Sequence, residues 1–163
     1  MNNELLQRII GEVVSRLQKR ADSSLSLSVA QLREADPRAL VCQYSALIIE
    51  HADLPLLAHI AQHDSSDVSA ITLHEALACG VRVKISLQHQ LLPAIPVRKL
   101  ARLPLEFSDE RGQTIILHPE TLLSYADVAR LQGGFLVLRR RCVVTALAKE
   151  TVSMRNIQLI KQE

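Results

Sequence analysis

Two histidines in the first half of the chain have the spacing at which two imidazoles can share a metal ion. His59 and His63 are one helical turn apart and could reach one metal if residues 54–63 are helical. Asp64 and Asp67 follow closely and could add carboxylate ligands, but the segment lacks the His-Glu-x-x-His pattern of helical zinc sites. Histidines at this spacing are also common on helix surfaces, so we expect no metal site here.

The three cysteines, Cys42, Cys79 and Cys142, are odd in number and form no Cys-x-x-Cys pair. This usage favours free thiols in a reducing compartment over a disulfide framework. Cys79 precedes Gly80 at the end of a predicted helix, where the negative end of the helix dipole disfavours a reactive thiolate. Cys42 and Cys142 lie in apolar, strand-like patterns and are predicted to be small core residues. No nucleophile, base and orienting group can be placed together, so we expect no catalytic residues and no enzyme.

The densest basic run is Arg139, Arg140 and Arg141. In a turn between strands we expect three arginines to be solvated, and the alternative is contact with an anion or an acidic partner surface. The chain has neither a Gly-x-Gly-x-x-Gly motif nor a Walker-type loop, so we expect no nucleotide and no cofactor. A formal net charge of +2 and an aromatic content of 2% also argue against binding to nucleic acid.

Near the N-terminus, seven aliphatic residues recur at a spacing that gathers them on one half of a helix. They are Leu5, Leu6, Ile9, Ile10, Val13, Val14 and Leu17. The opposite half carries Glu4, Arg8, Glu12 and Arg16, which alternate in sign at i,i+4 spacing, so each neighbouring pair adds a few tenths of a kcal/mol. We therefore predict an amphipathic docking helix over residues 1–20, followed by a polar linker at 21–24.

An isolated helix of this length is marginal in water, so its apolar stripe must find a surface. That surface could be the chain's own core, a second copy, or a groove on a partner protein. A membrane surface is disfavoured because the polar face is balanced in charge and the apolar face has no Trp or Phe. The terminus lacks the uninterrupted apolar stretch of a signal peptide, and no window reaches the ~18 to 20 apolar residues that cross a bilayer. We therefore expect a cytoplasmic protein.

Residues 25–163 are predicted to form a small single α/β domain with a mixed sheet and flanking helices. At 163 residues, roughly two-thirds of the surface exposed in the unfolded chain can be buried. Apolar alternation predicts strands at 25–28, 81–87, 105–107, 114–117, 135–138, 142–145 and 157–160, with a hairpin within 39–50. Helical spacing predicts helices at 29–35, 54–62, 69–78, 122–131 and 146–154, and Pro96 and Pro104 bound one more.

A weak internal repeat is visible at an offset of 96 residues. Leu-Ser-Val-Ala at 27–30 aligns with Leu-Ser-Tyr-Ala at 123–126, and Leu40 and Val41 fall on Leu136 and Val137. If the repeat is real, the same elements should stand at both places and the two halves should be related by a pseudo-twofold axis.

Three segments together carry a family resemblance. They are Leu-Gln-Arg-Ile-Ile with Glu-Val-Val-Ser-Arg-Leu at 6–10 and 12–17, Gln-Leu-Leu-Pro-Ala-Ile-Pro-Val-Arg-Lys-Leu-Ala-Arg-Leu-Pro-Leu at 90–105, and Arg-Asn-Ile-Gln-Leu-Ile-Lys-Gln-Glu at 155–163. They resemble the PduM family, small components of the bacterial propanediol-utilisation microcompartment. The resemblance runs essentially end to end. It implies a structural or assembly role in a protein-shelled organelle that houses the coenzyme B12-dependent breakdown of 1,2-propanediol, and it brings no catalytic residues.

In such organelles, short amphipathic helices at protein termini are similar to encapsulation peptides, which bring cargo to shell proteins or gather cargo together. The first hypothesis is therefore a non-enzymatic assembly protein that docks on shell or cargo proteins through the seven-residue stripe, and that could also form a homo-oligomer. The alternative is an accessory protein whose α/β body binds a flavin or a cobalamin-related cofactor at the carboxyl ends of its strands. Missing Gly-rich loops and scarce aromatics argue against that alternative, and an enzyme using Cys or His chemistry ranks last.

Overall fold

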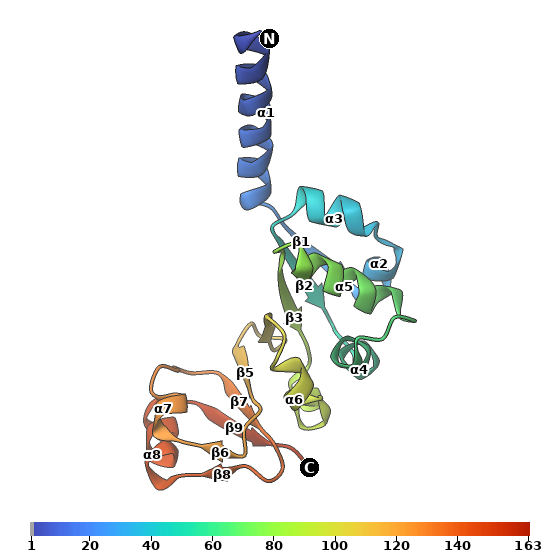
Figure 1. Ribbon diagram of the computed structural model, residues 1–163. Helices are drawn as coiled ribbons and strands as arrows, with labels where there is room; N and C mark the ends of the chain where they lie inside the picture. The colour runs from blue at the N-terminus through green and yellow to red at the C-terminus, as the bar shows by residue number, and fades with distance from the viewer. Residues whose placement is uncertain (1) are drawn as a thin grey trace.

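The computed structural model describes residues 2–163, so only Met1 of the predicted helix lies outside the described part, and it shows a long helix joined to an α/β body (Figure 1). The helices are α1 (Asn3–Ala21), α2 (Val29–Glu34), α3 (Pro37–Gln43), α4 (Leu54–Gln62), α5 (Val68–Ala78), the 3-10 helix η1 (His89–Ala94), α6 (Val97–Leu100), α7 (Tyr125–Val128) and α8 (Ala146–Met154). The strands are β1 (Ser24–Ser28), β2 (Ala46–Glu50), β3 (Arg82–Ser86), β4 (Leu105–Ser108), β5 (Thr114–His118), β6 (Leu122–Leu123), β7 (Phe135–Leu138), β8 (Val143–Val144) and β9 (Gln158–Lys161).

Seven strands form one mixed sheet in the order β1-β2-β3-β4-β5-β7-β9. Strands β1 to β4 run parallel, β5 turns back antiparallel to β4, and β7 and β9 run parallel to β5. Strands β6 and β8 form a small separate parallel pair. The mixed sheet, the flanking helices and the leading helix confirm the predicted α/β fold.

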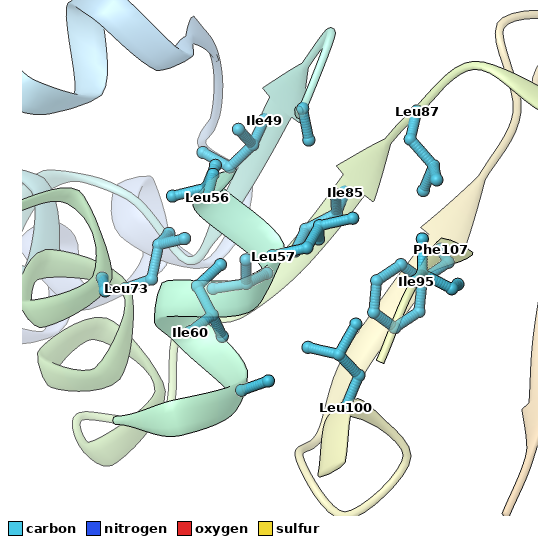
Figure 2. Close-up of a cluster of buried hydrophobic side chains, with 14 of the residues drawn as sticks. Ile49, Leu56, Leu57, Ile60, Leu73, Ile85, Leu87, Ile95, Leu100 and Phe107 are labelled. Carbon is cyan, nitrogen blue, oxygen red and sulfur yellow. The ribbon is translucent and has the colours of Figure 1, made fainter. Parts of the chain in front are cut away.

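The larger core lies on one face of the sheet. Because β1 to β4 lie in chain order, connections of one hand place their helices on the same face. Leu47, Ile49, Val83 and Ile85 of the strands belong to this core. Figure 2 shows Ile49 and Ile85 beside side chains of α4 and α5. Towards the other end of the sheet, η1 and α6 close the same face over Phe107 and Val137.

A second core covers the opposite face of β5, β7 and β9. Leu136 and Leu138 of β7 point into it, and α7, α8 and the β6–β8 pair lie over them. Over β1 to β3 this opposite face carries Ser26, Ile48 and Lys84 in one cross-strand row. Among the described residues, neither core cluster includes any of these three. One half of the sheet is therefore covered on both faces and the other half on one.

Two element predictions are wrong. Residues 39–50 do not form a hairpin, because the carboxylate of Asp36 accepts a hydrogen bond from the backbone N–H of Arg38 and Pro37 occupies the first turn, so α3 begins there. Residues 122–131 are not one helix. Leu122 and Leu123 pair with β8, and a short helix starts only after Ser124, whose N–H and hydroxyl donate to Asp127.

The repeat recurs only locally. Ser28 ends the short strand β1 and Ser124 follows the short strand β6, and each serine caps the start of a short helix. Leu40, however, lies in α3, whereas its counterpart Leu136 lies in β7 of the main sheet. Different elements at equivalent places contradict a twofold repeat of the whole domain.

Within residues 2–163, no helix has the length and apolar character that crossing a membrane requires.

Candidate functional site

The apolar stripe of α1 is open to solvent along its whole length. Its seven residues, Leu5, Leu6, Ile9, Ile10, Val13, Val14 and Leu17, are between 45% and 57% exposed. No residue of Asn3–Ala21 is buried. At 1.5 Å per residue the helix is about 28 Å long. It extends away from the body, with no other element alongside it (Figure 1). The predicted helix is present, and nothing in the described chain covers its apolar face.

The polar side of α1 supports the helix without tying it to the body. Arg16 donates to Glu12 at 2.7 Å, and both side chains are well exposed. An i,i+4 pair of this kind stabilises a helix by about 0.3–0.5 kcal/mol. The charged row therefore favours helix formation and leaves the apolar row free to bind.

The base of α1 is fixed by hydrogen bonds that the sequence did not reveal. Arg20 Nε donates to the carbonyl oxygen of Val41 at 2.8 Å, and Ser45 Oγ donates to that of Ala21 at 2.9 Å. The Ser45 N–H donates to the carbonyl of Ser23 at 2.9 Å. Only Asp22 and Ser23 separate helix from strand, so the connection is shorter than the four residues predicted at 21–24. The helix therefore leaves the body in a defined direction.

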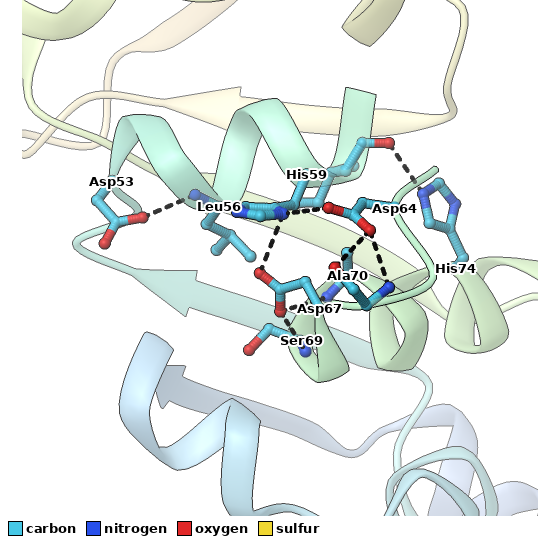
Figure 3. Close-up of polar contacts among 10 residues, drawn as sticks. Asp53, Leu56, His59, Asp64, Asp67, Ser69, Ala70 and His74 are labelled. Carbon is cyan, nitrogen blue, oxygen red and sulfur yellow. Dashed lines mark hydrogen bonds and ion pairs between the residues drawn. The ribbon is translucent and has the colours of Figure 1, made fainter. Parts of the chain in front are cut away.

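His59 lies between two carboxylates on the surface formed by α4 and α5 (Figure 3). Its Nδ1 is 2.8 Å from Asp64 Oδ2 and 3.7 Å from Asp67 Oδ2. Asp67 also caps α5, because its other oxygen accepts from the N–H of Ser69 at 2.8 Å. Hydrogen bonds from the hydroxyl and N–H of Ser66, followed by that from His59, lower the pKa of Asp64 to about 2. This cluster fastens the connection between two helices.

His63 does not join His59. It ends α4 in the left-handed conformation, with φ of 52°, and its ring stacks on His74 with centroids 4.1 Å apart. His74 Nε2 donates to the carbonyl of Ile60 at 2.9 Å. Within the described residues, no three His, Cys, Asp or Glu side chains are grouped as a metal ion would require. The two histidines have separate structural contacts.

All three cysteines are free, and their environments differ. Cys142 is buried as predicted, and burial raises the pKa of its thiol. The prediction for Cys42 is wrong: it lies in α3 and is exposed, because the helix that begins at Pro37 carries it outward. Cys79 caps the end of α5 and is exposed.

The arginine run does not act as one group. Arg139 Nη1 donates to the carbonyl of Pro119 at 3.2 Å and so holds the segment before β6. Arg140 and Arg141 form an exposed turn between β7 and β8. Contact of these two with an anion or an acidic partner stays a prediction.

The hollows of the body lie at or below the lower end of the size range of ligand sites. One of about 350 Å³ lies where β4 and β5 diverge, lined by Lys84, Leu105, Glu106 and Ile116 among others. A smaller one of about 270 Å³ lies near the carboxyl ends of β3 and β4, beside His89 and Asp109. Sites for drug-sized ligands span about 300–1,000 Å³ and bury most of the ligand. Binding of a flavin or cobalamin-related cofactor stays a prediction.

Comparison with known proteins decides the family. The family model described as "Putative propanediol utilisation" matches residues 8–158. The chain is 75% identical over 163 residues to the bacterial microcompartment assembly protein PduM of Citrobacter freundii, covering 100% of both chains. It is 55% identical, again over 163 residues and 100% of both chains, to the protein of the same name from Salmonella typhimurium strain LT2. The chain belongs to the PduM family.

Membership of the PduM family confirms the resemblance inferred from the sequence. The two relatives cover the chain from end to end, so the alignments include α1 as well as the body. No solved structure matches the chain.

Proposed function

We propose that this chain is a non-enzymatic structural protein of the propanediol-utilisation microcompartment and that α1 docks it on shell or encapsulated proteins. The role in assembly is carried over from the two PduM relatives, which are named as microcompartment assembly proteins. The single observation that supports α1 as the docking element is its exposed stripe of seven aliphatic side chains. In this proposal residues 1–20 are a docking unit, and residues 25–163 are the body that presents it inside the compartment.

The energetics of the stripe suit a contact that is repeated within an assembly. Burying the exposed half of seven aliphatic side chains would contribute roughly 5–10 kcal/mol, at about 1.5–3 kcal/mol for a fully buried one. Association costs an estimated 4–15 kcal/mol in lost freedom of movement. One helix alone therefore binds weakly, and several copies on one surface bind strongly through their high effective concentration.

Two double substitutions in the full chain test the docking face. Ile10→Asp/Val14→Asp places two carboxylates in the stripe. Gly11→Asp/Ser15→Asp places the same two charges at the same spacing on the polar side, where an added Cβ at Gly11 has open space. We expect the stripe variant to be lost from purified microcompartments and the matched variant to be retained. Equal retention of the two variants would refute docking through the stripe.

A further inference from the structure

The smaller hollow of the body, which we call the polar hollow, lies at one edge of the main sheet. Its lining comes from the loops that follow β3 and β4 and from the first residues of β7 and β9, and it includes His89, Asp109, Phe135 and Gln158. These segments meet because β5, β7 and β9 run opposite to β3 and β4. Loops at the carboxyl ends of strands form the ligand crevice in open α/β sheets. This edge is therefore a suitable place for a small-molecule site.

A buried carboxylate with one free oxygen forms part of the polar hollow. Asp109 is only 3% exposed. Its Oδ1 accepts hydrogen bonds from the N–H groups of Arg111 at 3.0 Å and Gln113 at 2.7 Å. Among residues 2–163 no group donates to Oδ2, and this oxygen is not one of the side-chain atoms sealed from solvent. A carboxylate oxygen taken out of bulk water needs a donor, so Asp109 favours a ligand that donates to Oδ2.

The imidazole of His89 brings polar atoms that the fold does not use. The ring packs on Phe135 with centroids 4.8 Å apart, and the backbone N–H of His89 donates to Glu110 at 2.9 Å. Within the described chain neither ring nitrogen has a hydrogen-bond partner. A neutral imidazole has one donor and one acceptor nitrogen, and the side-chain amides of Gln113 and Gln158 add groups of both kinds. The hollow thus offers donors and acceptors together.

The charges of the polar hollow favour a neutral ligand. Hydrogen bonds from its own N–H and from that of His89 lower the pKa of Glu110, so this carboxylate is ionised and already has donors. Two carboxylates, Asp109 and Glu110, disfavour an anion, and Arg111 in the same lining disfavours a small cation. A hydroxyl group both donates and accepts, and so it matches the mixed lining. The buried ring of Phe135 offers an apolar surface to a short carbon chain.

We propose that the polar hollow binds a small neutral molecule that carries two or more hydroxyl groups on a short carbon chain. One hydroxyl donates to Asp109 Oδ2, and a second bonds to the ring of His89. The hollow of about 270 Å³ has room for about nine water-sized groups of ~30 Å³ each, so the ligand has at most about nine non-hydrogen atoms. This site lies in the body and is independent of docking through α1.

Titration of the full chain, followed by the NMR signals of its backbone amides, tests the class of ligand. The probes are 1,2-propanediol, chosen because the matching family model is described by propanediol utilisation, and glycerol. Propionate and 1-aminopropane have three carbons as well and carry opposite charges. We expect at least one of the two polyols to give saturable shifts at His89, Arg111 and Gln113, and the two ions to give none. Two polyols without effect there would overturn the proposal, as would an ion that binds as tightly as the polyol.

Two substitutions test the named contacts. Asp109→Asn keeps the acceptor Oδ1 and replaces Oδ2 by a donor, and His89→Phe keeps a ring on Phe135 but removes both ring nitrogens. Each should weaken polyol binding roughly two- to tenfold, as expected for one lost hydrogen bond. The control Glu120→Gln removes an exposed carboxylate just beyond the other end of β5 and should leave binding unchanged.

Equal binding by all three variants and the wild type would refute the assignment of the site. If Asp109→Asn disturbs the turn that its carboxylate holds, the spectrum of the unliganded chain shows it and His89→Phe decides. Neither outcome bears on the proposed docking role, because recovery of Ile10→Asp/Val14→Asp with microcompartments is measured separately.

Discussion

Helices α1 and α4 carry the same two-row aliphatic pattern, and only one of them is covered. In α4, Leu56, Leu57, Ile60 and Ala61 are buried against the sheet. In α1, Ile9 and Ile10 are about half exposed. Sequence pattern thus specifies a helix that must pack on something, whereas the topology of the chain decides whether that surface lies in the same molecule. The free energy of binding that α4 uses within the fold is still available in α1 for a partner.

Truncating matched core and stripe positions should give the largest difference between these helices. Leu57 is 0% exposed, so Leu57→Ala should lower the free energy of unfolding by about 2–5 kcal/mol through lost contacts and a residual cavity. Ile10→Ala should change it by less than about 0.5 kcal/mol, because no core depends on that side chain. Urea denaturation followed by circular dichroism measures both. Similar losses at the two positions would show that α1 packs on its own body.

Replacing a glycine by alanine should have opposite effects on stability in the body and in α1. Gly134 has φ of +78°, and an added Cβ would collide with the backbone carbonyl of Thr114. Gly134→Ala should therefore destabilise the body by at least about 1–3 kcal/mol. Gly11 has open space around it, and alanine there should favour the helix by roughly 0.5–1 kcal/mol.

The melting temperature of the body reports the effect of Gly134→Ala. The helical circular dichroism signal reports the effect of Gly11→Ala on α1. A Gly11→Ala chain with less helix than the wild type would contradict an exposed, regular α1.

The smallest effects should come from the exposed carboxylates of Asp64, which accepts hydrogen bonds from Ser66 and His59, and of Glu12, which pairs with Arg16. The folded-state pKa of Asp64 lies below its ordinary 3.8, at about 2, so its contribution is present above pH 3.8 and is lost as pH falls towards 2. Asp64→Asn should lower the melting temperature slightly at neutral pH, and the difference should vanish near pH 2. Glu12→Gln, which breaks an exposed pair on α1, should leave the melting temperature unchanged. If the melting temperatures of the wild type and Asp64→Asn still differed near pH 2, the ionised carboxylate of Asp64 would not be the cause of the difference.

Local signals in the sequence predict most of the body. Alternation and helical spacing locate β3, α4, α5 and α8 because each has one clear period. The predictions failed where a single capping residue outweighs an apolar run. Asp36 with Pro37 starts α3 within an apparently strand-like segment, and Ser124 delays the start of α7. Such short elements contain too few residues to show a period.

The sequence predicts which residues form the candidate site, but it does not predict which elements lie around that site. The stripe was found because its side chains share one half of a helix. That no part of the described chain covers the stripe could not be predicted, because periodicity identifies an apolar face and not the surface that it contacts. In β1, serine alternates with leucine and so marks one outward face of the strand, but which strands lie beside it follows only from the sheet order. Local sequence patterns do not show which strands, far apart in the chain, pair with one another.

Hydrogen exchange of the backbone amides tests the central claim, that α1 is the docking element, most directly. The measurement compares the dilute chain alone with the same chain inside purified microcompartments. Amides of α1 should exchange quickly in the dilute chain, because an uncovered helix of this length opens readily, and slowly in the compartment. Amides of α8 should be protected alike in both. Equal exchange of α1 in the two states would contradict the account.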